Sequence, residues 1–113
     1  MNRSRIVYRA IQNDATSPAI FETLPFNATL LQISIRIQGA IATSEIIEIL
    51  KRSGVDAAYN TIVRTYDPSI TDAEFLLCPE ENVEFPKGDS ILVNFANTDL
   101  LTVGYELIFK EGD

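Results

Sequence analysis

The chain contains no histidine and no tryptophan, and only one of its 113 residues is a cysteine. The absence of histidine removes the commonest general base, the Ser-His and Cys-His nucleophile pairs, and the usual ligands of zinc and copper. One cysteine can form neither an intrachain disulfide nor a thiolate metal site on its own. From these absences we predict a protein that is not an enzyme, with no catalytic residue, no metal site and no cofactor.

Other residues with chemical potential are isolated or spread along loops. Cys78 follows two leucines and precedes a proline, which predicts a buried, unreactive side chain. The five glycines are scattered, so no phosphate loop is predicted, and Gly104 inside a strand pattern predicts a β-bulge or a close backbone approach. Asp67, Asp72 and Glu74 share a short loop without the ligand order of an EF-hand, and we interpret them as solvated acids.

The aromatic residues give little support to a sugar-binding site. Such sites favour exposed aromatic platforms, often tryptophan, whereas most aromatic residues here fall on the side of the strand pattern that predicts the core. We therefore expect core packing from the tyrosines, which are Tyr8, Tyr59, Tyr66 and Tyr105.

Long apolar runs and a secretory signal are missing as well. No stretch approaches the roughly 18 apolar residues that a membrane-spanning helix needs. The first residues carry arginines but lack the apolar region of a signal peptide. We expect a protein that is made and assembled in a cytoplasm and has no membrane partner.

Positive charge is scarce and unevenly distributed. The net charge is −7, and residues 65–113 hold two basic against eleven acidic side chains. Because phosphate binding depends on clustered lysine and arginine, this balance argues against nucleic acid as the main partner. The acidity favours solubility. Arg3, Arg5 and Arg9 form a small basic segment, and they are the candidate residues for docking on an acidic neighbour.

Alternation of apolar and polar side chains is the dominant positive signal. In residues 85–109, two runs alternate with the period of two that half-buried strands require, and a polar turn at 97–99 separates them. The apolar faces consist of Ile91, Val93 and Phe95 in the first run and Val103, Tyr105, Leu107 and Phe109 in the second. We interpret the pair as the closing hairpin of the fold.

Earlier segments repeat the pattern. The clearest strand spans Ala28–Gln38, and its predicted apolar face consists of Leu31, Ile33, Ile35 and Ile37. Residues 3–12 predict a first strand with Ile6, Tyr8 and Ala10 on one face. Shorter strands are expected near residues 19–24, 74–78 and 83–85.

Residues 43–54 are ambiguous. Thr43 or Ser44 could cap a helix that ends before Gly54. The isoleucines and leucine within so short a segment also suit a strand, and the all-β surroundings favour that choice. Its partner strand is then predicted at Ala57–Tyr66.

These elements predict about eight strands separated by turns roughly ten residues apart, a spacing typical of sandwiches and jelly rolls. The predicted fold is all-β, an antiparallel β-sandwich or jelly roll in a single domain. Residues 1–12 form an N-terminal arm or first strand, and residues 13–113 form the sandwich.

Two segments carry a resemblance to a known group of proteins. They read LLQISIRIQGAIATSEIIEILKRSGVDAAYNTIVRTYDPS and PKGDSILVNFANTD. Their order of strands and Gly-Asp, Thr-Ser-Glu and Asn-Thr-Asp turns resembles the small β-sandwich structural proteins of tailed bacteriophages. The resemblance covers residues 28–109, about three quarters of the chain, and consists of turn chemistry on strands with no functional-site motif.

The resemblance implies a capsid decoration or cement protein of the virion, assembled in the host cytoplasm. Such a protein binds the major capsid protein on the outer surface, stabilises the particle by bridging capsid subunits, and forms homo-oligomers, commonly trimers. The alternatives are a tail, fibre or baseplate module for host-surface attachment, and a carbohydrate-binding module.

Overall fold

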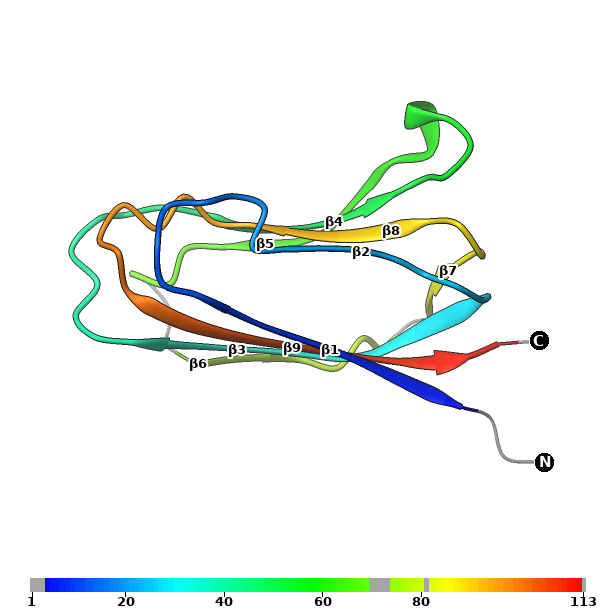
Figure 1. Ribbon diagram of the computed structural model, residues 1–113, viewed down its shortest axis with the longest axis horizontal. Coiled ribbons are helices and arrows are strands. Elements are labelled where there is room, and N and C mark those ends of the chain that lie inside the picture. Colours follow the sequence, from blue (N-terminus) through cyan, green and yellow to red (C-terminus); the bar gives the residue numbers. More distant parts are fainter. Residues whose placement is uncertain (1–3, 70–73, 81, 113) are drawn as a thin grey trace.

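A computed structural model describes residues 4–69, 74–80 and 82–112 of the chain. The described residues form two antiparallel sheets packed face to face (Figure 1). The strands are β1 (Arg5–Gln12), β2 (Ile20–Thr23), β3 (Ala28–Gln38), β4 (Ile47–Arg52), β5 (Thr61–Tyr66), β6 (Glu74–Leu77), β7 (Val83–Phe85), β8 (Ser90–Asn94) and β9 (Thr102–Glu111), and the 3₁₀ helix η1 (Ala57–Tyr59) lies between β4 and β5. Within these ranges no helix has the length and apolar character needed to cross a membrane.

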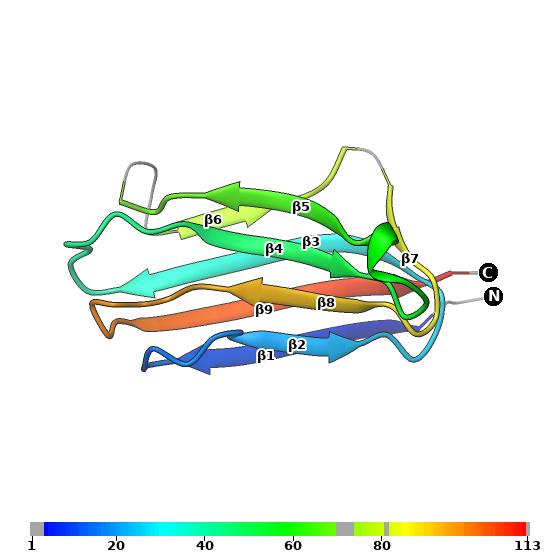
Figure 2. The same cartoon turned by 90° about the horizontal axis from the view of Figure 1, so that it is seen from above.

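The strand order is that of a jelly roll. One sheet has the order β1-β9-β3-β6 and the other β2-β8-β4-β5 (Figure 2). Strand β7 pairs with β3 on the same edge as β6, so β6 and β7 act as two parts of one interrupted strand. The chain therefore passes repeatedly between the two sheets, as two Greek keys require. This architecture confirms the predicted all-β sandwich.

The last two strands do not form the predicted hairpin. Strand β8 pairs with β2 and β4, whereas β9 pairs with β1 and β3 in the opposite sheet. The segment between them crosses from one sheet to the other and contains Asn97 and Leu100, both with positive φ angles of 51° and 54°. Alternation correctly predicted each strand, but it carries no information about which strand is the partner.

A bulge in β3 corrects the predicted apolar face. The pairing with β9 skips Leu31, because Leu30 lies opposite Phe109 and Gln32 lies opposite Ile108. The extra residue shifts the alternation by one position. Leu30 is therefore buried and Leu31 is half-buried, while Ile33, Ile35 and Ile37 are buried as predicted.

The ambiguous segment contains strand β4, which confirms the strand prediction over the helix. Its partner is shorter than predicted, because Ala57–Tyr59 forms η1 and β5 begins at Thr61. Asp56 caps this helix by accepting a hydrogen bond from the backbone N–H of Ala58 at 2.8 Å. Tyr59 is consequently 68% exposed, and the prediction that it packs in the core is wrong.

The core lies between the sheets and is filled by the inward-facing side chains of both. Phe85 and Phe109 are fully buried and meet edge-to-face, with ring centroids 5.2 Å apart. No buried side-chain nitrogen or oxygen within the described ranges lacks a hydrogen-bond partner. The other large apolar side chains that are fully or almost fully buried are Leu24, Ile33, Ile35, Ile47, Ile49, Ile91, Leu107, Val93 and Val103.

Two predictions about single residues are wrong. Cys78 is exposed. It directly follows β6, and the alternation of side chains along the strand places it on the same outward-facing side as Leu76, whereas the half-buried Leu77 faces the other way. Gly104 marks neither a bulge nor a close approach. The register of β9 with β1 and β3 continues unbroken past it, and a Cβ at this position would have no atom within 4 Å.

Candidate functional site

The outer face of the β1-β9-β3-β6 sheet contains a groove of about 990 Å³. Gly104 lies in its middle strand, directly opposite Ile11 on β1 and Arg36 on β3. Arg36 in turn lies opposite Glu74 on β6. Because glycine has no side chain, this row of the sheet has a gap in the centre of an otherwise covered surface. We call this feature the Gly104 groove.

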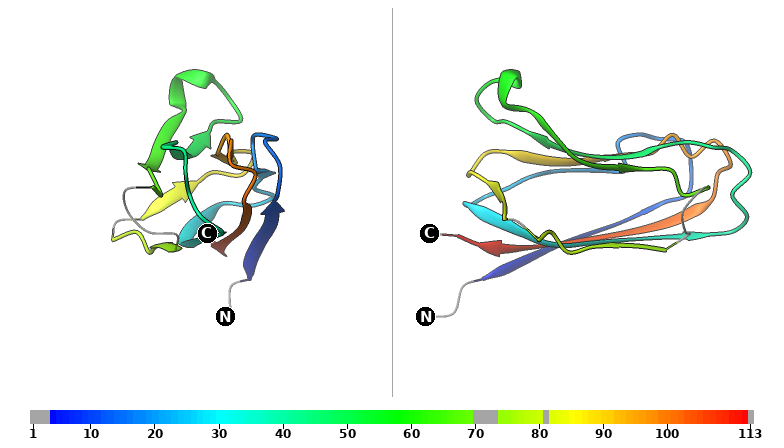
Figure 3. Two further views of the ribbon diagram at one scale, coloured as in Figure 1. Left: turned by 90° about the vertical axis from the view of Figure 1, so that its left-hand side faces the viewer. Right: turned by 180° about the vertical axis from the view of Figure 1, so that it is seen from behind.

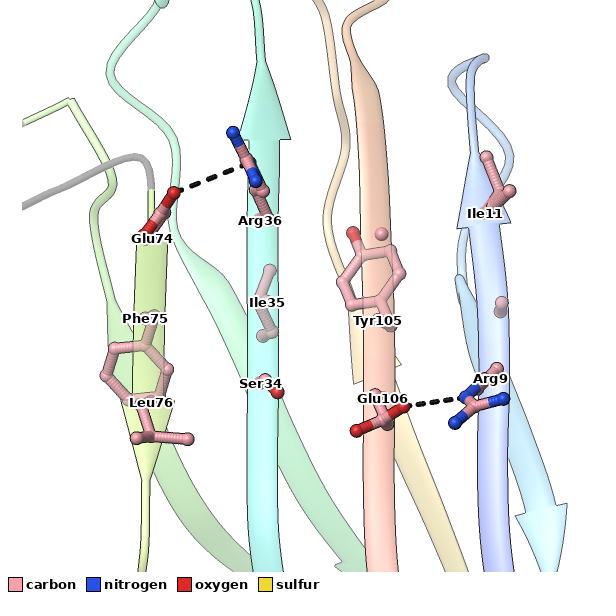
Figure 4. A pocket seen from close by; sticks show the side chains of 12 residues that line it. Arg9, Ile11, Ser34, Ile35, Arg36, Glu74, Phe75, Leu76, Tyr105 and Glu106 are labelled. Carbon is pink, nitrogen blue, oxygen red and sulfur yellow. Dashed lines mark hydrogen bonds and ion pairs between the residues drawn. The ribbon is translucent and has the colours of Figure 1, made fainter.

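A second row of side chains lines the same groove (Figure 4). Glu106 lies between Arg9 on β1 and Ser34 on β3, and Leu76 follows on β6. The Arg9 Nε and Glu106 Oε2 atoms are 2.6 Å apart, and the Arg36 Nε and Glu74 Oε1 atoms are 3.4 Å apart. Both ion pairs are solvent-exposed and contribute little to folding.

Apolar side chains flank these ion pairs on both edges of the sheet. Ile11 is 75% exposed on one side of the groove and Leu76 is 63% exposed on the other. Exposed apolar groups around a recess with a few polar groups are typical of a surface that binds another molecule. The arrangement can accommodate apolar side chains of a partner and can form hydrogen bonds or ion pairs with its polar groups.

A buried hydrogen-bond network lies beneath the groove. The Tyr105 hydroxyl donates to Oε1 of Gln12 at 2.6 Å, and the Gln12 amide donates to the carbonyl oxygens of Phe95 and Thr16 at 2.8 and 3.0 Å. Burial raises the pKa of Tyr105 above its ordinary value, so its hydroxyl remains protonated. The network therefore fixes the floor of the groove and offers no acid or base near neutral pH.

A second prominent surface is formed by residues 51–64, which we call the β4–β5 arm. It projects from the β2-β8-β4-β5 sheet beyond the body of the sandwich (Figures 1 and 3). Val55, Tyr59 and Ile62 on this arm are 88%, 68% and 58% exposed. Three large apolar side chains thus lie in solvent on one projecting segment.

The end of the arm has a defined backbone shape. The Ser53 hydroxyl oxygen accepts from the N–H groups of Val55 and Asp56, and the Asn60 side chain accepts from the N–H of Ser53 at 2.8 Å. The backbone N–H of Tyr59 donates to the carbonyl oxygen of Asp56 at 3.0 Å. These hydrogen bonds hold the exposed side chains on a preformed turn.

The base of the arm is tied to the sandwich. The backbone N–H of Gly54 donates to Oδ1 of the buried Asp89 at 3.0 Å. A Cβ at Gly54 would overlap the carbonyl oxygen of Gly88, so only glycine fits this contact. Lys51 donates from Nζ to the carbonyl oxygen of Glu84 at 2.5 Å. The arm is therefore anchored at its base and exposed at its tip.

The structure separates the arginines that were predicted to dock a partner. Arg9 lines the Gly104 groove and pairs with Glu106. Arg5 is exposed on the same face of β1, four residues before Arg9, and lies opposite Lys110 on β9. Arg3 lies outside the described residues. No element brings Arg5 and Arg9 together into one cluster.

The loop carboxylates organise turns in the described part of the chain. Asp67 accepts hydrogen bonds from the hydroxyl groups of Ser44 and Ser69, and these bonds lower its pKa, with the Ser44 bond as the largest cause. No group of three or more potential metal ligands occurs among the described residues. Asp72, which was predicted to share this loop, lies outside them.

Neither surface was found from the sequence. Ile11 and Leu76 are apolar at outward-facing positions of their strands, a signal that contradicts the alternation and could have been noticed. Tyr59 is an aromatic residue beside a turn-rich segment, but the sequence pattern of residues 57–66 predicts a strand there, whereas the structure has η1. Ile11 and Leu76 line the same groove only because of the order of the strands in the sheet. Alternation along the sequence does not predict that order.

No protein-family model matches the chain, and no curated protein matches it. A functional assignment therefore depends on the sequence pattern, the fold and these two surfaces.

Proposed function

We propose that this chain is a non-enzymatic structural protein of a virus particle, a capsid decoration or cement protein. In this role it binds the major capsid protein on the outer surface and stabilises the particle by bridging subunits. The proposal extends the resemblance to phage structural proteins, and the jelly-roll strand order is compatible with it. Its location is the virion, after assembly in the host cytoplasm.

One structural observation carries the proposal. The same domain has two separate surfaces with exposed apolar side chains, the Gly104 groove and the β4–β5 arm. A protein that bridges neighbours needs at least two contact surfaces, and each of these combines apolar side chains with arginine. Tyrosine and arginine are enriched among the residues that dominate binding energy at interfaces.

The N-terminal arginines have a supporting role in this proposal. Arg5 is exposed at the start of β1 and can reach an acidic surface on the capsid, and Arg3 remains a candidate from the sequence alone. Exposed charges of this kind chiefly accelerate association and make it dependent on salt. We therefore propose that these arginines speed the approach to the capsid and contribute little of the binding free energy.

Capsid binding tests the proposal. Purified protein is mixed with isolated capsids that lack it, and co-sedimentation and the capsid melting temperature are measured. The proposal expects saturable binding and a higher capsid melting temperature. Arg5→Ala is expected to weaken binding chiefly at low salt, whereas Lys87→Ala, on an exposed turn, serves as the matched control. Absence of binding by folded wild-type protein would refute the decoration role.

A second candidate function is attachment to a host surface as part of a tail, fibre or baseplate. The exposed Tyr59 at the tip of a preformed turn favours it, because an exposed aromatic ring can stack on a sugar. Glycan-array or host-cell binding that is lost in Tyr59→Ser, without capsid binding, would support attachment over decoration.

A further inference from the structure

We infer that the tip of the β4–β5 arm of one copy docks in the Gly104 groove of a second copy. The inference rests on the proposed function and on the homo-oligomer that the resemblance implies, and deepens the proposal by naming the two surfaces that join the copies. The convex surface is the tip with Val55 and Tyr59, and the concave surface is the groove centred on Gly104.

The tip has the properties of an interface anchor. Val55 and Tyr59 are largely exposed, although the turn beneath them is held by several hydrogen bonds. A preformed turn loses less conformational entropy on binding than a flexible one. The chain thus presents a tyrosine and a branched apolar side chain, both largely exposed, on a backbone turn that is already formed.

The groove offers a matching recess. Gly104 leaves open space in the sheet, and Ile11 and Leu76 provide apolar contacts on its two sides. The recess is open to solvent, and its volume of about 990 Å³ leaves room for more than one side chain of a partner. Such a recess can receive the Tyr59 ring together with a neighbouring side chain of the tip.

Charge favours a second copy of this chain as the occupant. Residues 51–64 hold three basic and one acidic side chain, whereas the rest of the chain holds six basic and fifteen acidic ones. Arg52 and Arg64 are exposed on the arm and have no ion-pair partner among the described residues. The Glu74 carboxylate at the groove is also exposed and can accept from an incoming guanidinium. The basic arm is therefore attracted to the acidic body of another copy as a whole, while the groove lining itself is neutral because Arg9 and Arg36 balance Glu106 and Glu74.

The geometry excludes docking within one copy. The arm projects from the β2-β8-β4-β5 sheet, whereas the groove lies on the outer face of the opposite sheet (Figures 1 and 3). The contact therefore joins different surfaces of two copies. Contacts of this head-to-tail kind produce a closed ring if the rotation closes and a chain if it does not.

Mixing two defective variants tests the inference without any capsid. Tyr59→Ser removes the anchor and keeps the groove, whereas Gly104→Leu fills the groove and keeps the anchor. A side chain at position 104 has space, since a Cβ there would meet no atom within 4 Å. Circular dichroism confirms that both variants fold. Sedimentation velocity and light scattering measure the size of each protein and of their equimolar mixture.

Wild-type protein is expected to self-associate in a concentration-dependent manner, and each variant is expected to weaken association by about tenfold or more. The mixture is expected to form heterodimers, because one intact tip and one intact groove remain. Ile46→Ser, which removes an exposed apolar side chain outside both surfaces, is expected to associate like the wild type.

Three outcomes overturn the inference: a monomeric wild-type protein at all concentrations, variants that associate normally, or a mixture that stays monomeric. Raising the salt concentration from about 50 mM to about 500 mM is expected to weaken wild-type association, and an unchanged affinity would contradict the charge argument. Heterodimers without capsid binding would leave this inference intact and refute the proposed decoration role. Capsid binding by a strict monomer would do the reverse.

Discussion

At the scale of single residues, Asn97 shows how one side chain fixes the crossing between the two sheets. It is fully buried and has a positive φ angle of 51°. Its Nδ2 donates to the carbonyl oxygens of Asp14 and Leu101, and its Oδ1 accepts from the N–H of Leu101, each at 2.9 Å. Asparagine tolerates this backbone conformation better than most residues.

We predict that Asn97→Ala lowers the free energy of unfolding by roughly 3 kcal/mol, because the hydrogen bonds are lost and alanine is strained at positive φ. Asn97→Gly loses the same hydrogen bonds without the strain, so it is expected to be less destabilising. Urea denaturation measures both. Equal values for the two variants would contradict a contribution from backbone strain.

Asp99 provides a prediction about pH. Its carboxylate accepts from the Thr43 hydroxyl at 2.6 Å and from the backbone N–H groups of Thr43 and Ala42. These bonds, the Thr43 hydroxyl first, lower its pKa below the ordinary value of 3.8. In acid the folded state then binds fewer protons than the unfolded state. Asp99 therefore contributes its full stabilisation when the pH is above its ordinary pKa, and this contribution is lost as the pH falls through its lowered pKa in the folded state.

We therefore predict that Asp99→Asn is less stable than the wild type at neutral pH and that the difference diminishes in acid. Melting temperatures measured from pH 7 down to about pH 2 check this prediction. A difference that stays constant over that range would show that the charge of Asp99 contributes nothing.

At the scale of elements, the β4–β5 arm depends on one close backbone contact. We predict that Gly54→Ala destabilises the protein by about 1–3 kcal/mol, because the added methyl group would overlap the Gly88 carbonyl oxygen and neither backbone can move freely. Gly104→Ala is the matched control, and it is expected to change stability by less than about 0.5 kcal/mol. Thermal unfolding compares the two, and a tolerated Gly54→Ala would contradict the proposed anchoring.

The strands were largely predictable, but their partners were not. Alternation identified β3, β8 and β9 because each has one face in the core. It misplaced Leu31, since a bulge adds one residue without any change in composition. The burial predicted for Cys78 came from its apolar sequence neighbours, and these do not tell which side of an edge strand a side chain faces. The predicted pairing of β8 with β9 is wrong, because two strands adjacent in sequence suggest a hairpin and these two lie in different sheets.

At the scale of the whole molecule, the Gly104 groove arises only because distant segments of the chain meet. The Gly104 groove joins Arg9 and Ile11 from the start of the chain with Leu76 and Glu106 from later strands. Jelly-roll topology places these strands side by side, and no local pattern encodes that order. The absence of histidine and the acidic balance could be interpreted from the sequence, but the shape that supports bridging could not.

Images of the particle test the central claim most directly. If the chain is a decoration protein, reconstruction of a purified virion by electron microscopy will show sandwich-shaped density on the outer capsid, in contact with the major capsid protein, and particles lacking the protein will lose that density. Density for this chain in the tail or baseplate, or none in the particle at all, would contradict the account.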